Sequence, residues 1–134
     1  MTRAILWDLD GVIVHSGPYH YEAYRRLFDE MGVALTEDRF HGELLGLRND
    51  AILHAVLGDV SDAEIEHLAA RKEETFRDLV RGNVGALPGA VALLRRARAA
   101  GLRQAIVSST PCENIELILA SLGVRQLLDA IVGE

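Results

Sequence analysis

The stretch Ala4–Val14, AILWDLDGVIV, constrains the fold more than any other part of the chain. Ala4–Trp7 is apolar throughout, which is typical of a strand buried on both faces of a parallel sheet. Asp8, Asp10 and Gly11 follow at its C-terminal end, where open α/β sheets bind their ligands. The stretch therefore predicts an α/β fold with a functional site directly after the first strand.

Asp8 and Asp10 are two residues apart, so on an ideal strand their side chains point to the same side. Two carboxylates placed so closely repel each other unless a cation or a shared proton intervenes. The pair therefore predicts a hard divalent metal, Mg²⁺, with Gly11 allowing the sharp turn that follows. The alternative is an ordinary polar turn, since Asp and Gly are both common in turns.

Charge and composition exclude several classes of protein. The formal net charge is 14 − 20 = −6, which disfavours a nucleic-acid-binding surface. The single cysteine rules out an internal disulfide and suits a reducing cytoplasm. No apolar run approaches the length of a membrane span, and the chain enters its first strand at once, so we expect neither a membrane anchor nor a signal peptide.

Residues from about 18 to 81 form a run of predicted helices with no strand among them. Pro18 suits the first turn of a helix that Gly32 ends, and Thr36 opens a weaker one. Asn49 caps a third helix, and Ser61–Glu64 is a capping box for a long fourth one. We expect a helical domain, 17–84, inserted into an α/β core formed by 1–16 and 85–134, with glycines at both hinges.

The α/β pattern resumes with a helix from Pro88 to Gly101, a strand at 104–107 and a further short strand at 129–132. Ser108, Ser109 and Thr110 end the middle strand and lead into a helix, with Thr110–Glu113 as its predicted capping box. Hydroxyls and free amides at a helix N-terminus can bind phosphate. The alternative is that these hydroxyls only cap the helix.

The two segments Trp7–Val12 and Ile106–Thr110, in this order, resemble the first and second motifs of the haloacid dehalogenase-like superfamily of phosphohydrolases. The helical block between them resembles the cap of the subgroup containing β-phosphoglucomutase and phosphoglycolate phosphatase. The resemblance implies a Rossmann-like parallel core sheet with an inserted cap. It implies that Asp8 is the nucleophile that becomes an aspartyl-phosphate, that Asp10 is the general acid/base, that both ligate Mg²⁺, and that Gly11, Ser108 and Ser109 bind phosphate.

The resemblance also singles out residues of the cap. His20 matches a histidine near the cap hinge, and Arg48 matches an arginine that reaches the substrate phosphate; the alternative for each is a solvated helix or loop residue. Leu45 stands where the sugar-phosphate mutases have a lysine, which weakens a mutase assignment. For Cys112 we expect a structural role. For Lys72 we expect a solvated position on a charged helix face; the alternative is a Schiff-base lysine like that of the family's phosphonate-cleaving members.

The chain lacks the third-motif lysine and the fourth-motif acids of the family, and chain order prevents Lys72 from replacing that lysine. We therefore expect an incomplete core, cut before the third motif, in which the first strand has an uncovered edge that favours self-association. The expected function is Mg²⁺-dependent hydrolysis of a small phosphorylated metabolite, by a chain that is inactive alone. The alternatives are a phosphosugar mutase and a non-catalytic, partner-binding remnant.

Overall fold

The computed structural model describes residue 1 and residues 3–134, which divide into two compact units. One unit, here called the core unit, comprises Met1–Ser16 and Val80–Glu134; the other, the helical unit, comprises Gly17–Leu79. The second boundary lies at 79/80, in the last turn of α4 (Asp62–Val80), whereas the glycines led us to expect it at 84/85. Among the described residues, no helix is both long enough and apolar enough to cross a membrane.

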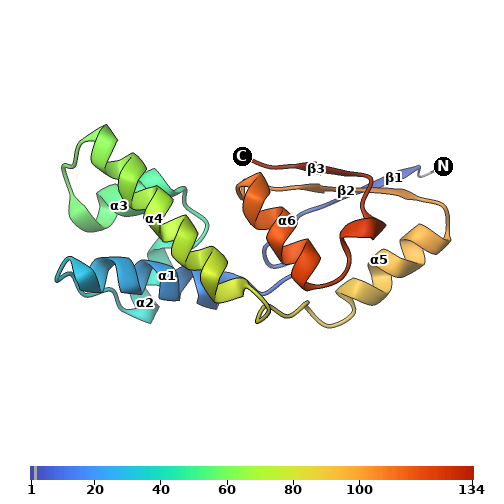
Figure 1. Cartoon of the computed structure of the whole chain (residues 1–134), viewed down its shortest axis with the longest axis horizontal. Coiled ribbons are helices and arrows are strands. Elements are labelled where there is room, and N and C mark those ends of the chain that lie inside the picture. The colour runs from blue at the N-terminus through green and yellow to red at the C-terminus, as the bar shows by residue number, and fades with distance from the viewer. Residues whose placement is uncertain (2) are drawn as a thin grey trace. The chain divides into compact units, whose positions relative to one another are not determined.

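The core unit contains a three-stranded parallel sheet in the order β1-β2-β3 (Figure 1). The strands are Ala4–Trp7, Arg103–Val107 and Ala130–Val132, and the helices between them are α5 (Ala90–Ala99) and α6 (Cys112–Ser121), with a 3₁₀ turn at Arg125–Leu127. The expected α/β core and its parallel sheet are confirmed. As expected, β1 lies at an edge of the sheet, paired only with β2 among the described strands.

Both core helices cover the same face of the sheet. The connections β1 to β2 and β2 to β3 both step across the sheet in the same direction, and such connections between parallel strands are right-handed. Their helices, α5 and α6, must therefore lie on the same face, and Figure 1 shows both below the strands. Gln104, buried on this side, donates to the carbonyl oxygens of Leu94 at 2.9 Å and Leu127 at 3.2 Å. Trp7 Nε1 donates to Gln104 Oε1 at 3.0 Å, so one amide links β1 and β2 to the elements beneath them.

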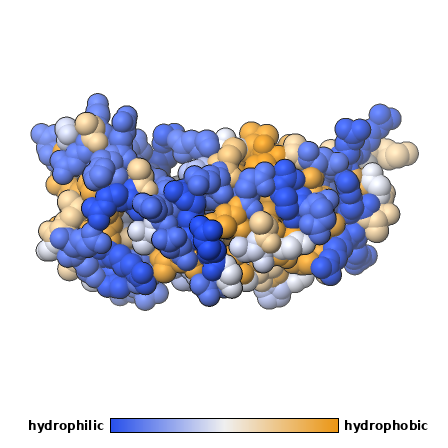
Figure 2. All heavy atoms as spheres, in the orientation of Figure 1, coloured by the Kyte–Doolittle hydropathy of each residue, from blue (hydrophilic) through white to orange (hydrophobic). Residues whose placement is uncertain are grey.

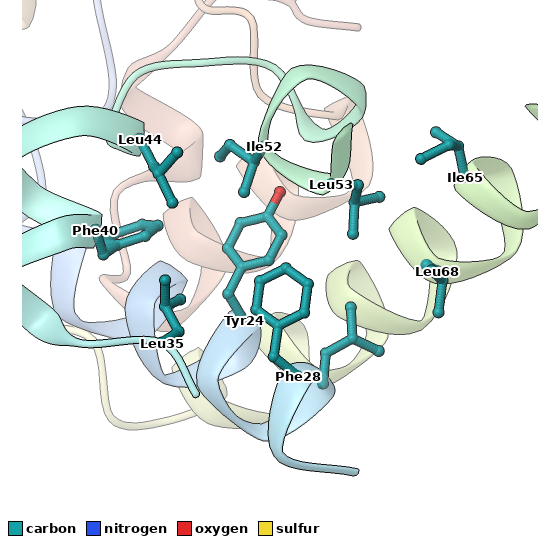
Figure 3. Packing of buried hydrophobic residues seen from close by; sticks show 10 residues of the cluster. Tyr24, Phe28, Leu35, Phe40, Leu44, Ile52, Leu53, Ile65 and Leu68 are labelled. Atoms are coloured by element: carbon teal, nitrogen blue, oxygen red, sulfur yellow. The ribbon is translucent and has the colours of Figure 1, made fainter. Parts of the chain in front are cut away.

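The helical unit contains α1 (Gly17–Glu30), α2 (Glu37–Arg39), a π-helical turn (Phe40–Leu44), α3 (Asn49–Leu57) and α4 (Asp62–Val80, whose last residue belongs to the core unit). Their apolar sides form one core around stacked Tyr24 and Phe28, whose ring centroids lie 5.7 Å apart (Figure 3). The predicted N-terminal cap of α4 is present, since Glu64 donates its amide to Ser61 Oγ at 3.3 Å. The prediction of helices without strands is thus confirmed for this unit.

Candidate active site

The residues after β1 form a tight turn that presents both aspartates. The amides of Ile13 and Val14 donate to the carbonyl oxygen of Leu9, and Gly11 donates to Val14 at 2.8 Å. Gly11 has a φ of 75°, in the left-handed region, and this explains why glycine occupies the position. Leu9 is fully buried beneath the turn, whereas Asp8 on one side of it is exposed.

Asp8 is the accessible member of the pair. Its Oδ1 accepts a 2.7 Å hydrogen bond from the amide of Leu9, which fixes the carboxylate at the end of β1. A carboxylate that is exposed at a strand end and held by a backbone amide is oriented for attack on a ligand arriving from solvent. The geometry therefore fits the nucleophilic role that the resemblance implies for Asp8.

Asp10 is held between two hydroxyl groups. Ser16 Oγ donates to Asp10 Oδ1, and Thr110 Oγ1 donates to Asp10 Oδ2 at 2.6 Å. Both donors are buried, with exposed fractions of 2% and 7%, respectively. The two contacts use both carboxylate oxygens, so Asp10 is fixed from the start of the helical insertion on one side and from the β2–α6 loop on the other.

Thr110 does not cap α6 as expected. The residue preceding the helix is Pro111, no side chain caps the first turn, and the threonine hydroxyl is engaged by Asp10 instead. The capping-box prediction was wrong because the partly buried carboxylate of Asp10 takes the threonine hydroxyl. Sequence reasoning missed both Thr110 and Ser16 as partners of Asp10; the only signal for either was a hydroxyl residue close to a strand end.

Ser108 and Ser109 lie where the second motif predicted them, directly after β2. The amide of Ser108 continues the ladder by donating to Val132 O at 3.0 Å, and its Oγ accepts from the amide of Thr110 at 3.1 Å. With its oxygen occupied as an acceptor, the Ser108 hydroxyl can still donate its proton to an anion. The amide of Cys112 donates to the carbonyl oxygen of Glu134 at 3.1 Å. One of the amides at the start of α6 is therefore already paired, and fewer remain to bind a phosphate than at a helix start without such a contact.

The helical unit holds a second set of candidate residues, linked by a buried polar network. Lys72, only 2% exposed, donates to His20 Nδ1 at 3.0 Å and to Glu73 Oε1 at 2.8 Å. An ammonium group can only donate, so His20 Nδ1 carries no proton in this arrangement. His20 also stacks on Phe76 with ring centroids 4.1 Å apart, which fixes the plane of the imidazole.

The network continues from Glu73 to the start of α3. Asn49 Nδ2 donates to Glu73 Oε1 at 2.8 Å, and Tyr24 donates its hydroxyl to Asn49 Oδ1 at 2.5 Å. Burial, aided by the charge of Glu73, raises the pKa of Tyr24 above its usual range and keeps this hydroxyl protonated. Arg48, the exposed residue before Asn49, therefore lies at a helix start that the buried network holds in place.

The structure corrects the expectation for Lys72. The residue occupies a buried position in the apolar stripe of α4, between Leu68 and Phe76 at helical spacing, rather than a solvated face. Its ammonium group lies 4.9 Å from the ring centroid of Tyr24, so two aromatic rings and Glu73 compensate its burial. That spacing was the available signal: a lysine replaced an apolar residue in the stripe.

The described residues provide few ligands for a metal ion. They contain no group of three His, Cys, Asp or Glu side chains that could hold one. Mg²⁺ often takes only one or two protein carboxylates and completes its shell with water and substrate phosphate, so the exposed Asp8 suits it as one ligand. A carboxylate oxygen can accept from a hydroxyl and ligate a cation at the same time, so Asp10 is the candidate for the second carboxylate ligand.

Paired carboxylates after the first strand, hydroxyls after the second and a helical unit inserted between them define an α/β protein of the phosphate-handling kind. Residues 5–134 match the family model described as haloacid dehalogenase-like hydrolase, so the chain belongs to that family of hydrolases.

Among curated relatives, a phosphoglycolate phosphatase from Cereibacter sphaeroides is 30% identical over 134 residues, covering 96% of this chain and 61% of the relative. The solved structure of CbbY from Rhodobacter sphaeroides in complex with phosphate superposes with a TM-score of 0.85 at 25% identity, over 99% of this chain and 64% of that one. A β-phosphoglucomutase from Clostridium difficile gives a TM-score of 0.81 at 27% identity, over 98% and 61%. The chain thus spans less than two thirds of the length of these relatives.

Proposed function

We propose that the chain supplies the nucleophile and the general acid/base of a phosphohydrolase that acts on a small phosphorylated metabolite. The observation that carries the proposal is the contrast between the two aspartates: Asp8 is exposed at the end of β1, and Asp10 is oriented by two buried hydroxyls. Membership of a hydrolase family, with a phosphoglycolate phosphatase among its relatives, supports the substrate class. The reducing cytoplasm is the compartment we propose, since the only cysteine is a free thiol.

In the proposed reaction, an Asp8 oxygen attacks phosphorus while the bond from phosphorus to the alcohol oxygen breaks. Asp10 gives its proton to the departing oxygen; in the second step it accepts a proton from the water that attacks the aspartyl-phosphate and releases Asp8. Ser108 donates its hydroxyl to a phosphoryl oxygen. When bound, Mg²⁺ would offset the charge repulsion between Asp8 and the phosphate.

Ser16 and Thr110 orient Asp10 for this cycle. Each of its oxygens accepts one of these hydroxyl hydrogen bonds, and because a carboxyl oxygen has two lone-pair sites, the contacts are compatible with proton transfer at Asp10. His20 and Arg48 stay predictions as substrate contacts, with their positions in the helical unit fixed by the buried network.

The assay uses two proteins, because the chain matches only 61% of its relative. The chain alone, with Mg²⁺ and para-nitrophenyl phosphate, should release no phosphate. A chimera in which this chain replaces the matching part of the Cereibacter sphaeroides enzyme should hydrolyse phosphate monoesters. Asp8→Asn should abolish that turnover, and Asp10→Asn should slow it by roughly 10²–10⁴-fold.

Asp59→Asn, a change of the same kind at an exposed position outside the proposed machinery, is the matched control and should be neutral. Activity that survives Asp8→Asn would overturn the proposal. The assay also addresses the second candidate, a phosphosugar mutase, which the likeness to β-phosphoglucomutase favours and the exposed Leu45 disfavours. Isomerisation of β-glucose 1-phosphate without phosphate release would identify the mutase.

A further inference from the structure

Charge is divided unevenly between the two units. The helical unit has 7 basic and 14 acidic residues, so its formal charge is 7 − 14 = −7, and the core unit carries 7 − 6 = +1. Within the core unit, the acidic residues that follow the carboxyl ends of the strands are Asp8, Asp10, Glu113 and Glu134. Most of the basic residues lie at the opposite end of the sheet, away from the candidate active site.

Five arginines gather at the amino ends of the strands, and we call them the arginine face: Arg3, Arg95, Arg96, Arg98 and Arg103. The last turn of α5 carries Arg96 and Arg98. β2 begins at Arg103, whose amide donates to the carbonyl oxygen of Arg3 at 3.2 Å. Asp129 accepts from Arg98 at 2.9 Å and, one residue past Arg103, from a backbone amide at 2.8 Å. With one carboxylate beside five guanidinium groups, this face carries 5 − 1 = +4.

The arginine face is open to solvent. All five arginines are exposed, and in the part of the chain that the structure describes only Arg98 forms an ion pair. Leu93, 49% exposed, lies one turn before Arg96 on α5 and adds apolar surface. Figure 2 shows hydrophilic residues at the surface where α5 lies in Figure 1. Clustered guanidinium groups repel one another and bind carboxylates in bidentate fashion, so the face favours an acidic partner.

The helical unit provides an acidic surface of matching charge. Residues 58–70 join α3 to α4 and form the first turns of α4, and they contain no lysine or arginine. Their four acidic residues, all exposed, are here called the acidic segment: Asp59, Asp62, Glu64 and Glu66. The nearest ion pairs of α4 are those of Arg71 and Lys72, so among the described residues these four have no cationic partner. The acidic segment carries −4, which equals the charge of the arginine face in magnitude.

We propose that the arginine face of one copy of this chain binds the acidic segment of a second copy. The two surfaces differ from each other, so the contact is heterologous, and each added copy leaves one of each free. The assembly is therefore an open series, or a ring where it closes. A net charge of −6 disfavours nucleic acid and anionic membranes as occupants, whereas the acidic segment supplies four carboxylates for four uncompensated cations. The proposal is independent of the proposed function, because the arginine face lies at the end of the sheet opposite Asp8.

Sedimentation velocity of the 134-residue chain at increasing protein concentration tests the contact. At about 0.1 M salt the Debye length of about 10 Å screens the net repulsion between copies but not ion pairs in contact. We expect the mean mass to rise with concentration under this condition. At about 1 M salt, where the Debye length is about 3 Å, only single chains should remain.

A charge swap identifies the two surfaces. One variant carries Arg95→Glu with Arg96→Glu, and the other carries Asp62→Lys with Glu66→Lys. Each alone should stay a single chain, because its two surfaces then have charge of the same sign. An equimolar mixture should assemble again, because the reversed surfaces complement each other. The matched control, Glu74→Lys with Asp78→Lys, reverses two exposed acids with the same spacing on α4 and should assemble like the wild type.

Several outcomes would overturn the proposal. They are single chains at every concentration, assembly that persists at high salt, and assembly that survives the arginine substitutions. Assembly that Leu6→Lys abolishes and the arginine substitutions do not would place the interface on the sheet instead. Assembly that nuclease removes would reveal a nucleic-acid bridge between copies. Circular dichroism checks the folding of each variant, and two variants that are folded but fail to assemble when mixed also contradict the contact.

Discussion

Thr110 and Asp10, a hundred residues apart, are joined by a 2.6 Å hydrogen bond from the threonine hydroxyl to Oδ2 of the aspartate. The bond connects the loop after β2 to the turn after β1, so the second motif contributes more to the site than a phosphate-binding hydroxyl. Its partner on the other carboxylate oxygen is Ser16, the last residue before the helical unit. Asp10, the proposed acid/base, is thereby held by two parts of the core unit: the segment that precedes α1 and the loop between β2 and α6.

The first prediction concerns this bond. Thr110→Val keeps the shape of the side chain but removes the donor, and losing a hydrogen bond to a charged group should lower the free energy of unfolding by roughly 1.5–3 kcal/mol. Thr110→Ser keeps the hydroxyl, so its free energy of unfolding should fall far less. Urea unfolding of Thr110→Val, Asp10→Asn and the double variant measures the coupling energy. Strictly additive effects would show that the two residues do not interact.

Gly133 provides the second prediction. A Cβ at this position would lie 2.6 Å from the carbonyl oxygen of Thr110 and 2.7 Å from Ile115 Cδ1. Gly133→Ala should therefore displace the β2–α6 loop and destabilise the core by about 1–3 kcal/mol. Gly85→Ala is the matched control, since a Cβ there meets nothing within 4 Å and its φ is not in the left-handed region. Equal thermal unfolding midpoints for the two variants would show that the loop does not pack against Gly133.

The third prediction tests the buried network of the helical unit. Lys72→Met leaves Glu73, whose side chain is 12% exposed, without its cation, and should cost about 3–5 kcal/mol of stability. Arg71→Met, its neighbour, breaks an ion pair with Glu30 whose side chains are 42% and 60% exposed, and should cost about 0–1 kcal/mol. Chemical unfolding monitored by circular dichroism compares them. If both changes cost the same, Lys72 is not buried as described.

The fourth prediction is a loss of stability in acid. Hydrogen bonds from Arg25 and Arg26 lower the pKa of Glu22 to about 2 from its usual 4.5. A carboxyl group whose pKa is lower in the folded state stabilises the protein above its unfolded pKa, and this contribution is lost as the pH falls from about 4.5 to about 2. Glu22→Gln should therefore reduce the difference in melting temperature between pH 7 and pH 2.5. An unchanged difference would exclude Glu22 as a contributor.

Asp129 should act in the same direction. The amide of Gln104 and the guanidinium of Arg98 hold the pKa of this carboxyl below its usual value of 3.8, so its stabilising effect is present at neutral pH and disappears below about pH 3.8. Asp129→Asn should lower the melting temperature at pH 7 and converge with the wild type near pH 2. If the melting temperatures of Asp129→Asn and the wild type differed by the same amount at both pH values, this assignment would be contradicted.

Much of the fold could be predicted from the sequence because its signals are local. Three local patterns predicted helices or strands to within a few residues of their observed bounds. They are the apolar run Ala4–Trp7, the hydroxyl residues that mark the end of β2, and the helical spacing of apolar residues in the insertion. The capping box assigned to Thr110 was wrong, and so was the solvated face assigned to Lys72. Both errors concern polar side chains whose partners lie far away in the sequence, and no periodicity reports such pairings.

In the candidate site, too, the local pattern could be predicted and the pairing of distant residues could not. Asp8 and Asp10 stand out as a pair because two carboxylates follow an apolar strand, and the structure places them at the expected strand end. The sequence could not show that Asp10 accepts from Ser16 and Thr110, because serine and threonine beside a helix are usually capping residues. Nor could it show that Lys72 bonds both His20 and Glu73, and that Asn49, at the start of the helix after Arg48, bonds Glu73 in turn.

The measurement that tests the central claim most directly is capture of the phosphorylated intermediate. The chimera with the Asp10→Asn substitution, which slows hydrolysis of the intermediate, is mixed with acetyl phosphate and Mg²⁺, quenched in acid and digested for mass spectrometry. We predict one phosphorylated peptide, containing Trp7–Val12, with the phosphoryl group on Asp8 and none in the Asp8→Asn variant. A phosphoryl group on any other residue, or phosphate release by a protein that never labels Asp8, would contradict the account.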